Sequence, residues 1–498
     1  MPATAHHLAL DLGASSGRAM LGTFDGQRLK IEELHRFPNE PLRSGAGYSW
    51  NIAQLFDEIR RALSICGTRG VRLDGLAIDT WGVDYGLLSA GGELLGRPRH
   101  YRDPRTRGLM EQALQRVSRD EFYARTGVQL MPFNTVFQLL ADARDDPATL
   151  PAAQALLFMP DLLNSWLTGV RQSERTIAST SQLYDAVREE WAADLMQRLG
   201  LPAAIMPAVA PPGTVVGELR SEIAQEAGVR SVSVIAPASH DTASAVAAVP
   251  AVGSDWAYIS SGTWSLVGIE LPSPLRTAAA LEAGFTNEAG ACGTTCFLKN
   301  VPGLWLMQEC QRIWASQARE VPTDRLTAMA EAVEPLAVLI DPEHSGFADF
   351  CDMPARICEY CTATGQRPPD SPGAIVRCIL DSLALNYRMT LAALEHLTGR
   401  PIRVVHVVGG GSLNRLLCQL TADAVGRSVV AGPVEATAAG NILVQAMARG
   451  HLRSLEALRA VVSASFELTR FEPRPGVGWE EAESRLRARC TIPASGRI

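Results

Sequence analysis

Apolar residues recur along this chain at two periods, and the two periods predict strands alternating with helices. Residues 8–22 and 256–268 each predict a strand, a tight turn of small residues and a second strand. Apolar residues three and four positions apart predict amphipathic helices over 50–67 and 373–397. The pattern therefore favours a mixed α/β protein in which one strand–turn–strand unit occurs twice, a weak internal repeat.

The segments between these elements complete the expected order. A further strand is predicted over 29–37, and 73–88 is strand-like although charged and aromatic residues interrupt it. Residues 103–201 are expected to be mostly helical, and the proline-rich stretch 206–213 reads as a stiff connector. A short alternating strand over 231–236 then leads into a small-residue helix.

Length, composition and charge limit the class of protein. A chain of 498 residues is too long for one ordinary core, so two large domains are expected. Hydrophobic residues at 47% and charged residues at 20% are typical of a soluble globular protein. The net charge of −7 argues against nucleic acid or an anionic membrane as the main partner. No apolar run reaches the length of a membrane span and no secretory signal is visible, so we expect a cytoplasmic protein.

Ten cysteines are scattered through the chain. Cys358 and Cys361 form a CxxC pair, which suggests a zinc or redox site with Cys351 and Cys378 as further ligands. A second CxxC at a suitable spacing is missing, so small buried thiols in a reducing compartment are favoured. Whether Cys361 and Cys378 approach closely enough to pair stays open.

The first turn of small residues, Gly13–Gly17, has the composition of a phosphate-binding loop. Glycines allow successive N–H groups to converge on anionic oxygens, and Ser15, Ser16 and Arg18 add further donors. Asp11 precedes the turn and could hold Mg²⁺ directly or through water. The alternative is a plain β-hairpin. Because no GxxxxGK[ST] occurs here, a P-loop enzyme is disfavoured.

His240, Asp241 and Thr242 follow the predicted strand 231–236, and the small apolar run 243–249 predicts a helix with Asp241 and Thr242 near its N-terminus. An aspartate at the end of a strand, facing a crevice, is well placed to accept a proton. The alternative is that Asp241 only caps the helix. Gly82 allows a ligand to approach the backbone closely, with a β-bulge as its alternative.

Two glycine-rich turns mark the second half. Residues 260–263 (Ser-Ser-Gly-Thr) form the turn of the second strand–turn–strand unit, so two phosphate-binding hairpins could act as a clamp. Gly409–Gly411 separate a buried strand over 404–408 from a helix expected to begin at about Ser412. Such glycines let backbone approach a nucleotide at a helix N-terminus, although the spacing is not GxGxxG and a simple strand–helix turn is the alternative.

These motifs together resemble the sugar kinases of the FGGY type, within the actin-like ATPase superfamily. The resemblance runs from Leu8 to about Gln445, nearly the whole chain. The segments that carry it are Asp11–Arg18, Ile78–Tyr85, Ala238–Val246, Tyr258–Ser265, Leu298–Asn300 with Gly303–Leu306, Val407–Asn414 and Gly432–Ala436.

The resemblance implies an α/β fold of two RNase H-like (actin-like ATPase) domains with an active-site cleft between them. The N-terminal domain would span 1–249 and hold the sugar site, the catalytic aspartate and the first phosphate clip. The C-terminal domain would span 250–490 and hold the second clip and the adenosine site, with 491–498 as a tail. The implied reaction transfers the γ-phosphoryl group of ATP to O1 of L-rhamnulose, with Mg²⁺.

The resemblance also assigns roles to residues. Asp241 matches the general base and Asp11 the magnesium position. The positions that match sugar-binding residues are Gly82, His240, Asp241, Thr242 and Asn300. The positions that match ATP-binding residues are Ala14, Ser15, Ser16, Gly17, Arg18, Thr263, Gln308 and Gly410. One departure is Cys296, where an arginine is usual, so a charge contribution at that position is in doubt.

Other functions stay open at this point. The chain could phosphorylate another ketose, such as L-fuculose or D-xylulose, or act as a non-enzymatic actin-like nucleotide switch. The helical segment 103–201 and the Asp241 motif argue against the switch, because forming a filament requires neither. A monomer or a small homo-oligomer is expected.

Overall fold

A computed structural model describes residues 4–45, 47–348, 351–476 and 478–490. The chain forms two compact units, each built from segments that are distant in sequence. The first unit comprises 1–252, 270–298 and 436–466, and the second comprises 253–269, 299–435 and 467–498.

A six-stranded sheet, ordered β13-β14-β6-β1-β2-β3, is the frame of the first unit. Strands β14, β6 and β1 are parallel to one another, whereas β2, β3 and β13 pair antiparallel with their neighbours. The parallel strands are buried throughout most of their length, which explains their apolar sequences. The bounds of the six strands are β1 Ala5–Leu12, β2 Ser16–Phe24, β3 Leu29–Pro38, β6 Gly75–Thr80, β13 Thr214–Glu218 and β14 Ser233–Ala236.

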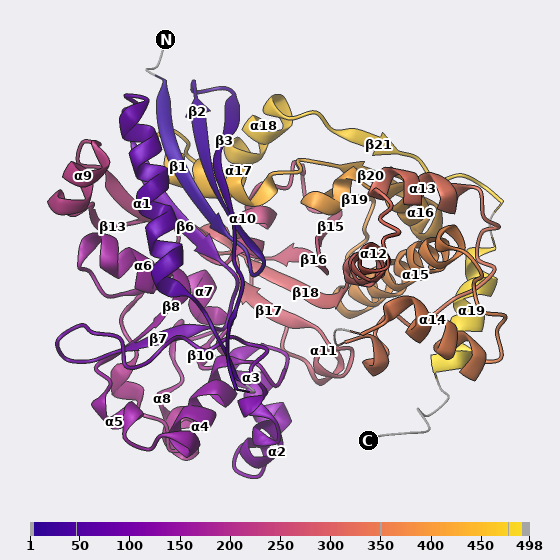
Figure 1. Ribbon diagram of the computed structural model, residues 1–498, viewed down its shortest axis with the longest axis horizontal. Helices are drawn as coiled ribbons and strands as arrows, with labels where there is room; N and C mark the ends of the chain where they lie inside the picture. The colour runs from indigo at the N-terminus through magenta and orange to yellow at the C-terminus, as the bar shows by residue number, and fades with distance from the viewer. Residues whose placement is uncertain (1–3, 46, 349–350, 477, 491–498) are drawn as a thin grey trace. The chain divides into compact units, whose positions relative to one another are not determined.

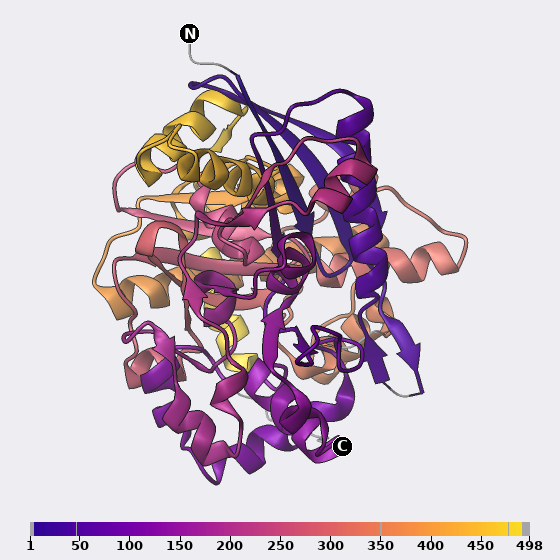
Figure 2. The same ribbon diagram turned by 90° about the vertical axis from the view of Figure 1, so that its left-hand side faces the viewer.

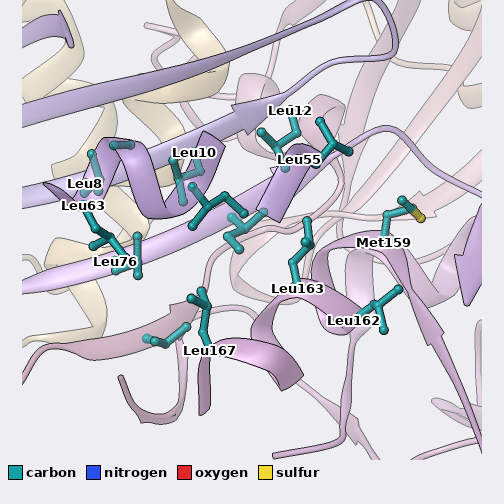
Figure 3. Packing of buried hydrophobic residues seen from close by; sticks show 14 of the residues in the cluster. Leu8, Leu10, Leu12, Leu55, Leu63, Leu76, Met159, Leu162, Leu163 and Leu167 are labelled. Carbon is teal, nitrogen blue, oxygen red and sulfur yellow. The ribbon is translucent and has the colours of Figure 1, made fainter. Parts of the chain in front are cut away.

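Leucines from two strands and two helices form the core on one face of this sheet. Leu8, Leu10 and Leu12 of β1 lie within the same buried cluster as side chains of α1 (Ile52–Thr68) and α6 (Met159–Thr168). Figure 3 shows these leucines pointing toward one another from β1, α1, β6 and α6. Each leucine contributes about 1.5–3 kcal/mol by leaving water, so this packing holds the sheet and both helices together.

The rest of the first unit is helical with short strands, as Figures 1 and 2 show. The segment 103–201, expected to be mostly helical, also contains four short strands. The remaining helices are α2 Leu109–Leu114, α3 Arg119–Thr126, α4 Thr135–Asp145, α5 Thr149–Ala152, α7 Arg175–Ser179, α8 Ala193–Leu199, α9 Ser221–Ala227, α10 Asp241–Ala247, α11 Ala278–Glu282, α17 Ala436–Ala448 and α18 Leu455–Ser465. The remaining strands are β4 Leu42–Ser44, β5 Gly47–Ser49, β7 Tyr85–Leu88, β8 Ala155–Phe158, β9 Ser173–Glu174, β10 Tyr184–Asp185, β11 Glu190–Trp191, β12 Val209–Ala210 and β17 Thr286–Ala289.

Helices α10 and α17 touch through backbone. A Cβ atom built at Gly440 of α17 would lie 1.8 Å from the carbonyl oxygen of Ser244 in α10. Only glycine therefore allows the two helices to lie this close. This contact places α17 directly behind the helix that begins at Asp241.

Parallel strands beside a hairpin also form the second unit. Its strands are ordered β16-β15-β19-β20-β21, with β15, β19 and β20 parallel and β15–β16 an antiparallel hairpin. The long helix α15 contacts α12, α13 and α16 of this unit (Figure 1). The strands are β15 Trp256–Ser261, β16 Trp264–Leu271, β18 Thr295–Pro302, β19 Val404–Val408, β20 Ser428–Ala431 and β21 Thr469–Phe471, of which β16 and β18 run across a unit boundary. The helices are α12 Trp305–Ser316, α13 Thr323–Glu331, α14 Met353–Ala363, α15 Pro372–Thr398, α16 Arg415–Val425 and α19 Trp479–Cys490.

The structure confirms the predicted repeat, because each unit sets one hairpin beside parallel strands. It corrects three details of the predicted elements. The stretch 73–88 is two strands, β6 and β7, separated by a turn at 81–84. The helix after the triple glycine begins at Arg415 rather than Ser412, because a 3-10 turn over Gly410–Leu413 precedes it. The helix after β14 begins at Asp241, as expected, but ends at Ala247 rather than Val249.

The compact units differ from the division at residue 249 in two segments. Residues 270–298 and 436–466 follow that boundary in sequence but pack with the first unit, because the chain returns to it twice. The division into domains 1–249 and 250–490 therefore stays a prediction. The expected tail 491–498 lies outside the described residues.

Nine cysteine side chains are described and none of the nine forms a disulfide, Cys361 and Cys378 included. The Cys361 thiol hydrogen-bonds that of Cys378, and this contact together with burial raises the pKa of Cys378 well above its usual value. The described residues contain no metal-binding group of three or more histidine, cysteine or acidic side chains, so the CxxC pair is not a zinc site there.

Within the part of the chain that the structure describes, no helix combines the length and the apolar character needed to cross a bilayer.

Candidate functional site

The carboxyl ends of three parallel strands bring acidic and histidine residues to one edge of the first unit's sheet. Asp11 of β1 lies opposite Asp79 of β6 in the strand register. Thr80 forms a parallel bridge with His240, which follows β14, and the Thr80 N–H donates to the Ser239 carbonyl at 2.9 Å. Ligands of open α/β sheets bind at this kind of edge.

Asp79 is a carboxylate that the sequence analysis left without a role. It is fully buried, and its Oδ2 atom accepts a 2.6 Å hydrogen bond from Asn441 Nδ2, while Oδ1 has no hydrogen-bond partner. Burial raises the pKa of Asp79 well above its usual range, and the nearby charges of Asp11 and Asp241 raise it further. Three carboxyl groups therefore share one neighbourhood.

Asp241 is the first residue of α10, and His240, rather than Asp241, is the N-cap residue. The Asp241 Oδ1 atom accepts hydrogen bonds from the Thr242 N–H at 2.6 Å and from the Thr242 hydroxyl at 3.2 Å. Burial raises the pKa of Asp241, His240 lowers it, and Asp11 raises it again, with a net rise. The side chain remains 32% exposed, so a carboxylate of raised basicity is accessible to a ligand.

A buried glutamate fixes the backbone just before Asp241. Glu174 caps α7 by accepting from the N–H groups of Thr176 and Ile177, and it also accepts from the Ser239 N–H at 3.0 Å. The Thr176 hydroxyl in turn accepts from the His240 N–H at 3.0 Å. The sequence analysis missed Glu174, whose only local signal was a position typical of a helix cap.

The His240 imidazole lies between two carboxylates. Its Nδ1 atom is 3.2 Å from Glu288 Oε2, and its Nε2 atom is 3.5 Å from Asp241 Oδ1. Burial lowers the pKa of His240, but the Glu288 and Asp241 carboxylates outweigh it, so the pKa of His240 is raised above 6.5. Glu288 comes from β17, which is distant in sequence, and no sequence signal indicated this pairing.

The predicted first clip is a hairpin turn between β1 and β2. The Gly13 N–H donates to the Ser16 carbonyl at 3.0 Å, and Asn39 ties the turn down through its N–H to Ser15 and its amide to the Gly13 carbonyl. Arg18 forms an ion pair with Asp11 across the hairpin. The hairpin that the sequence analysis held as an alternative is therefore present, and hairpin geometry is compatible with phosphate binding.

Packing within the first unit requires a glycine at position 17. A Cβ atom there would lie 2.2 Å from Cε2 of Phe37, a buried ring of β3. Ala14, Ser15 and Ser16 complete the same turn, and all three retain partial or full exposure.

Gly82 lies in the turn between β6 and β7. Asp84 lies two residues after Gly82 in the same turn. Its side chain is buried and accepts hydrogen bonds from Trp50 Nε1 at 2.6 Å and from Trp81 Nε1 at 3.0 Å. Burial raises the pKa of Asp84 to about 6, against the effect of these donors. The turn is therefore anchored inside the first unit while Gly82 itself stays partly exposed.

In the second unit, two predicted ATP-binding residues are in contact. The Thr263 hydroxyl donates to Gln308 Oε1 at 3.1 Å. Thr263 lies in the β15–β16 turn, whose carbonyls accept from the N–H groups of Gly303 at 3.1 Å and Trp305 at 3.2 Å. The start of α12 therefore holds this second clip in place.

The triple glycine packs against the strand that precedes the second clip. A Cβ atom at Gly411 would lie 2.0 Å from Ser261 Oγ, and Gly409 has a φ of 82°. Gly410 differs, because a Cβ atom there would meet nothing within 4 Å. The backbone of Gly410 is thus open to a ligand.

Two positions in β18 complete the set. Asn300 is exposed and follows Lys299, whose ammonium lies 3.2 Å from Glu343 Oε2. Cys296 is buried and lies opposite Glu288 in the strand register.

The predicted site residues fall into two groups, one in each unit. The first unit holds Asp11, Ala14–Arg18, Gly82 and His240–Thr242, and the second unit holds Thr263, Asn300, Gln308 and Gly410.

The acidic edge has side chains that suit Mg²⁺ only in part. No group of three or more acidic, histidine or cysteine side chains among the described residues could hold a metal by itself. Mg²⁺ usually binds through one or two carboxylates and completes its shell with water and substrate phosphates. Asp11, with Asp79 and its unpaired oxygen nearby, fits that role.

The chain is similar in sequence to known proteins. Two family models match: "FGGY family of carbohydrate kinases, N-terminal domain" over residues 6–248, and "FGGY family of carbohydrate kinases, C-terminal domain" over residues 257–449. A rhamnulokinase of Bacteroides thetaiotaomicron is 44% identical over 95% of this chain and 97% of its own. A rhamnulokinase of Enterococcus faecalis is 41% identical over 94% of both chains.

A solved structure supports the fold. The ligand-bound xylulose kinase from Lactobacillus acidophilus matches with a TM-score of 0.81 over 99% of both chains, at 15% identity. That identity supports a shared fold and nothing about substrate. Because the two family models together cover most of the sequence, the chain belongs to the FGGY family of carbohydrate kinases.

Proposed function

We propose that this protein transfers the γ-phosphoryl group of ATP to O1 of L-rhamnulose, giving L-rhamnulose 1-phosphate and ADP. The observation that carries the choice of sugar is the 41–44% identity to two rhamnulokinases over nearly the whole chain. The accessible Asp241 carboxylate, which lies close enough to Asp11 of the first hairpin for the Asp11 charge to raise its pKa beyond the effect of burial, supports the chemistry.

In this proposal Asp241 is the general base. Its carboxylate accepts the proton of the O1 hydroxyl as that oxygen forms its bond to the γ-phosphorus. The bond between the γ-phosphorus and the β–γ bridging oxygen breaks, and ADP leaves with that oxygen. A raised pKa suits Asp241 to this step, because a more basic carboxylate takes the proton more readily.

Two hairpin turns are proposed to hold the nucleotide. The turn Ala14–Arg18 would bind phosphate oxygens with backbone N–H groups, hydroxyls and the Arg18 guanidinium. Thr263 and Gln308, which hydrogen-bond to each other at the second clip, would bind the nucleotide there. The open backbone at Gly410 would lie against the adenosine. Phosphoryl transfer depends mostly on such positioning and charge neutralisation.

Sugar binding is assigned to Gly82, His240, Asp241, Thr242 and Asn300. Glu288 stabilises the protonated form of His240, and in that form the ring can donate strongly to a hydroxyl. Each polar group buried around the sugar needs a matching hydroxyl, which makes the choice of ketose selective.

Mg²⁺ is proposed as the metal, held by Asp11, where it would neutralise phosphate charge. Arg18 already pairs with Asp11 and so holds that carboxylate in position. A cleft between domains 1–249 and 250–490, a cytoplasmic location, and a monomeric or small homo-oligomeric state remain predictions.

A ketose panel tests the proposal directly. With ATP and Mg²⁺, coupled ADP release should give a kcat/KM for L-rhamnulose about tenfold or more above those for L-fuculose and D-xylulose, because a mismatched hydroxyl leaves a polar group unpaired. A higher kcat/KM for either other ketose would leave only the kinase class standing. No ADP release with any ketose would favour the nucleotide switch.

Asp241→Asn should fold and bind ATP yet lose turnover. A positioned general base contributes roughly 10²–10⁴-fold, so kcat should fall by about that factor. Steady-state kinetics measures the loss of turnover, and calorimetry measures ATP binding separately. Asp324→Asn, an exposed change in the first turn of α13, is the control and should keep wild-type turnover. Near-normal kcat in Asp241→Asn would reduce Asp241 to a structural residue.

Gly410→Val should raise the KM for ATP by about tenfold while leaving the KM for the ketose nearly unchanged. A side chain there meets only open space in the free protein, so the fold should be kept. The same side chain would occupy the space proposed for adenosine. Gly17→Val is the contrast. Its side chain would collide with Phe37, so the melting temperature should fall as well. An equal rise in both KM values for Gly410→Val would argue against an adenosine contact.

Glu288→Gln should lower the pKa of His240, because the neighbouring negative charge that raises it is removed. In the wild type, the stabilisation from this pair is complete below the unfolded pKa of about 6.5 and is lost as pH rises through the higher folded pKa. An NMR titration of the His240 ring, assigned with His240→Gln, measures the shift. Glu111→Gln, an exposed change in α2, should leave the titration unchanged.

A further inference from the structure

The turn that carries Gly82 has a strained backbone. Val83 has a φ of 69°, a left-handed conformation that β-branched side chains rarely adopt. The Asp84 N–H donates to the Gly82 carbonyl at 2.9 Å, so residues 82–84 form a three-residue turn with a positive φ at its centre. Such a conformation persists only where the surrounding structure holds it.

Two buried threonines hold the two polar groups of Val83. The Thr180 hydroxyl accepts from the Val83 N–H at 3.0 Å, and the Thr135 hydroxyl donates to the Val83 carbonyl at 2.7 Å. Gln138 Nε2 approaches the same carbonyl at 3.5 Å. Thr180 is 5% exposed and Thr135 is fully buried, so both act on the turn from inside the protein.

Thr180 also packs against Gly82. A Cβ atom at Gly82 would lie 3.0 Å from Thr180 Cγ2 and 3.1 Å from its Cβ and Oγ1 atoms. The Thr180 hydroxyl donates to the Ile177 carbonyl at 2.8 Å, which fixes its rotamer. Among the described residues, no backbone carbonyl accepts from the Gly82 N–H.

Thr180 is the C-cap residue of α7, the short helix whose N-cap is Glu174. Glu174 binds the Ser239 N–H, and the Thr176 hydroxyl of the same helix binds the His240 N–H. One five-residue helix thus holds both the Gly82 turn and the segment that leads into Asp241. A displacement at Thr180 would change the position of Gly82 relative to the proposed base.

We propose that Thr180 and Thr135 are positioning residues for the ketose, which hold the strained turn so that the Gly82 backbone meets the sugar in register with Asp241. The inference depends on the proposed function, in which Gly82 binds the sugar. Because both threonines are buried, their effect on the sugar passes through the turn rather than through direct contact.

Thr180→Val tests this inference, because valine keeps the shape of the side chain and removes the oxygen that receives the Val83 N–H. The KM for the preferred ketose should rise on the order of tenfold, while the KM for ATP stays within about twofold of the wild type. Thr180→Ser keeps the hydroxyl and should restore the ketose KM. Thr135→Val should show a smaller rise, since Gln138 also reaches the Val83 carbonyl.

Thr126→Val is the matched control. Thr126 is as buried as Thr180 and makes the same pair of bonds, donating to the Phe122 carbonyl and accepting from the Val128 N–H. Thr126→Val should lower the melting temperature without raising the KM for the ketose relative to the KM for ATP. If Thr180→Val behaves like Thr126→Val, or if Thr180→Ser fails to restore the ketose KM, the positioning role is wrong.

The two proposals fail in different ways. If the wild type prefers another ketose, that ketose replaces L-rhamnulose in the comparison, and the positioning role is tested unchanged. If the wild type neither turns over nor binds any ketose in calorimetry, both proposals are overturned. Normal wild-type turnover with an unchanged ketose KM in Thr180→Val overturns only the positioning role.

Discussion

Parallel pairing of β1, β6 and β14 is the constraint on which the candidate site of the first unit depends. Parallel strands end at the same edge of a sheet, so Asp11, Asp79 and His240 come together although they are far apart in sequence. Burial raises the pKa of Asp79 and of Asp241, and the nearby charge of Asp11 raises both further. This edge favours ligands that bring positive charge or donate a proton.

A buried polar framework holds that edge in place. Glu174 accepts from three backbone N–H groups, and the Thr176 and Thr180 hydroxyls accept from two more. A buried carboxylate is costly unless its hydrogen bonds are satisfied, and here each bond also fixes a functional segment. The helix α7 therefore orders the site even though none of its residues resembles a catalytic motif.

The second unit repeats the plan with different chemistry. A hairpin again lies beside parallel strands, but its edge holds glycines and hydroxyls rather than carboxylates. Thr263 meets Gln308 because α12 begins directly under the hairpin turn, and Gly411 packs against Ser261. The acidic edge suits proton transfer and metal binding, whereas the glycine-rich edge suits the close approach of a nucleotide.

The sequence by itself determined the features that depend on local order. Alternating apolar residues predicted both hairpins, the 3.6-residue period predicted α1 and α15, and the motifs around Asp11, Asp241 and Gly410 indicated the family. These signals are local because strand, helix and turn preferences depend on neighbouring residues. The same reasoning assigned the glycine at position 17 to a nucleotide, which stays a prediction, but it did not indicate that packing against Phe37 also requires a glycine there.

Only the tertiary structure decided which distant residues support the site. Glu174, Glu288 and Thr180 act on segments that lie 48 or more residues away in sequence, through single hydrogen bonds or ion contacts. Segments 270–298 and 436–466 pack with the first unit although they follow it in the chain. No local pattern encodes such contacts, because a buried polar atom finds its partner by the path of the chain rather than by its sequence neighbours.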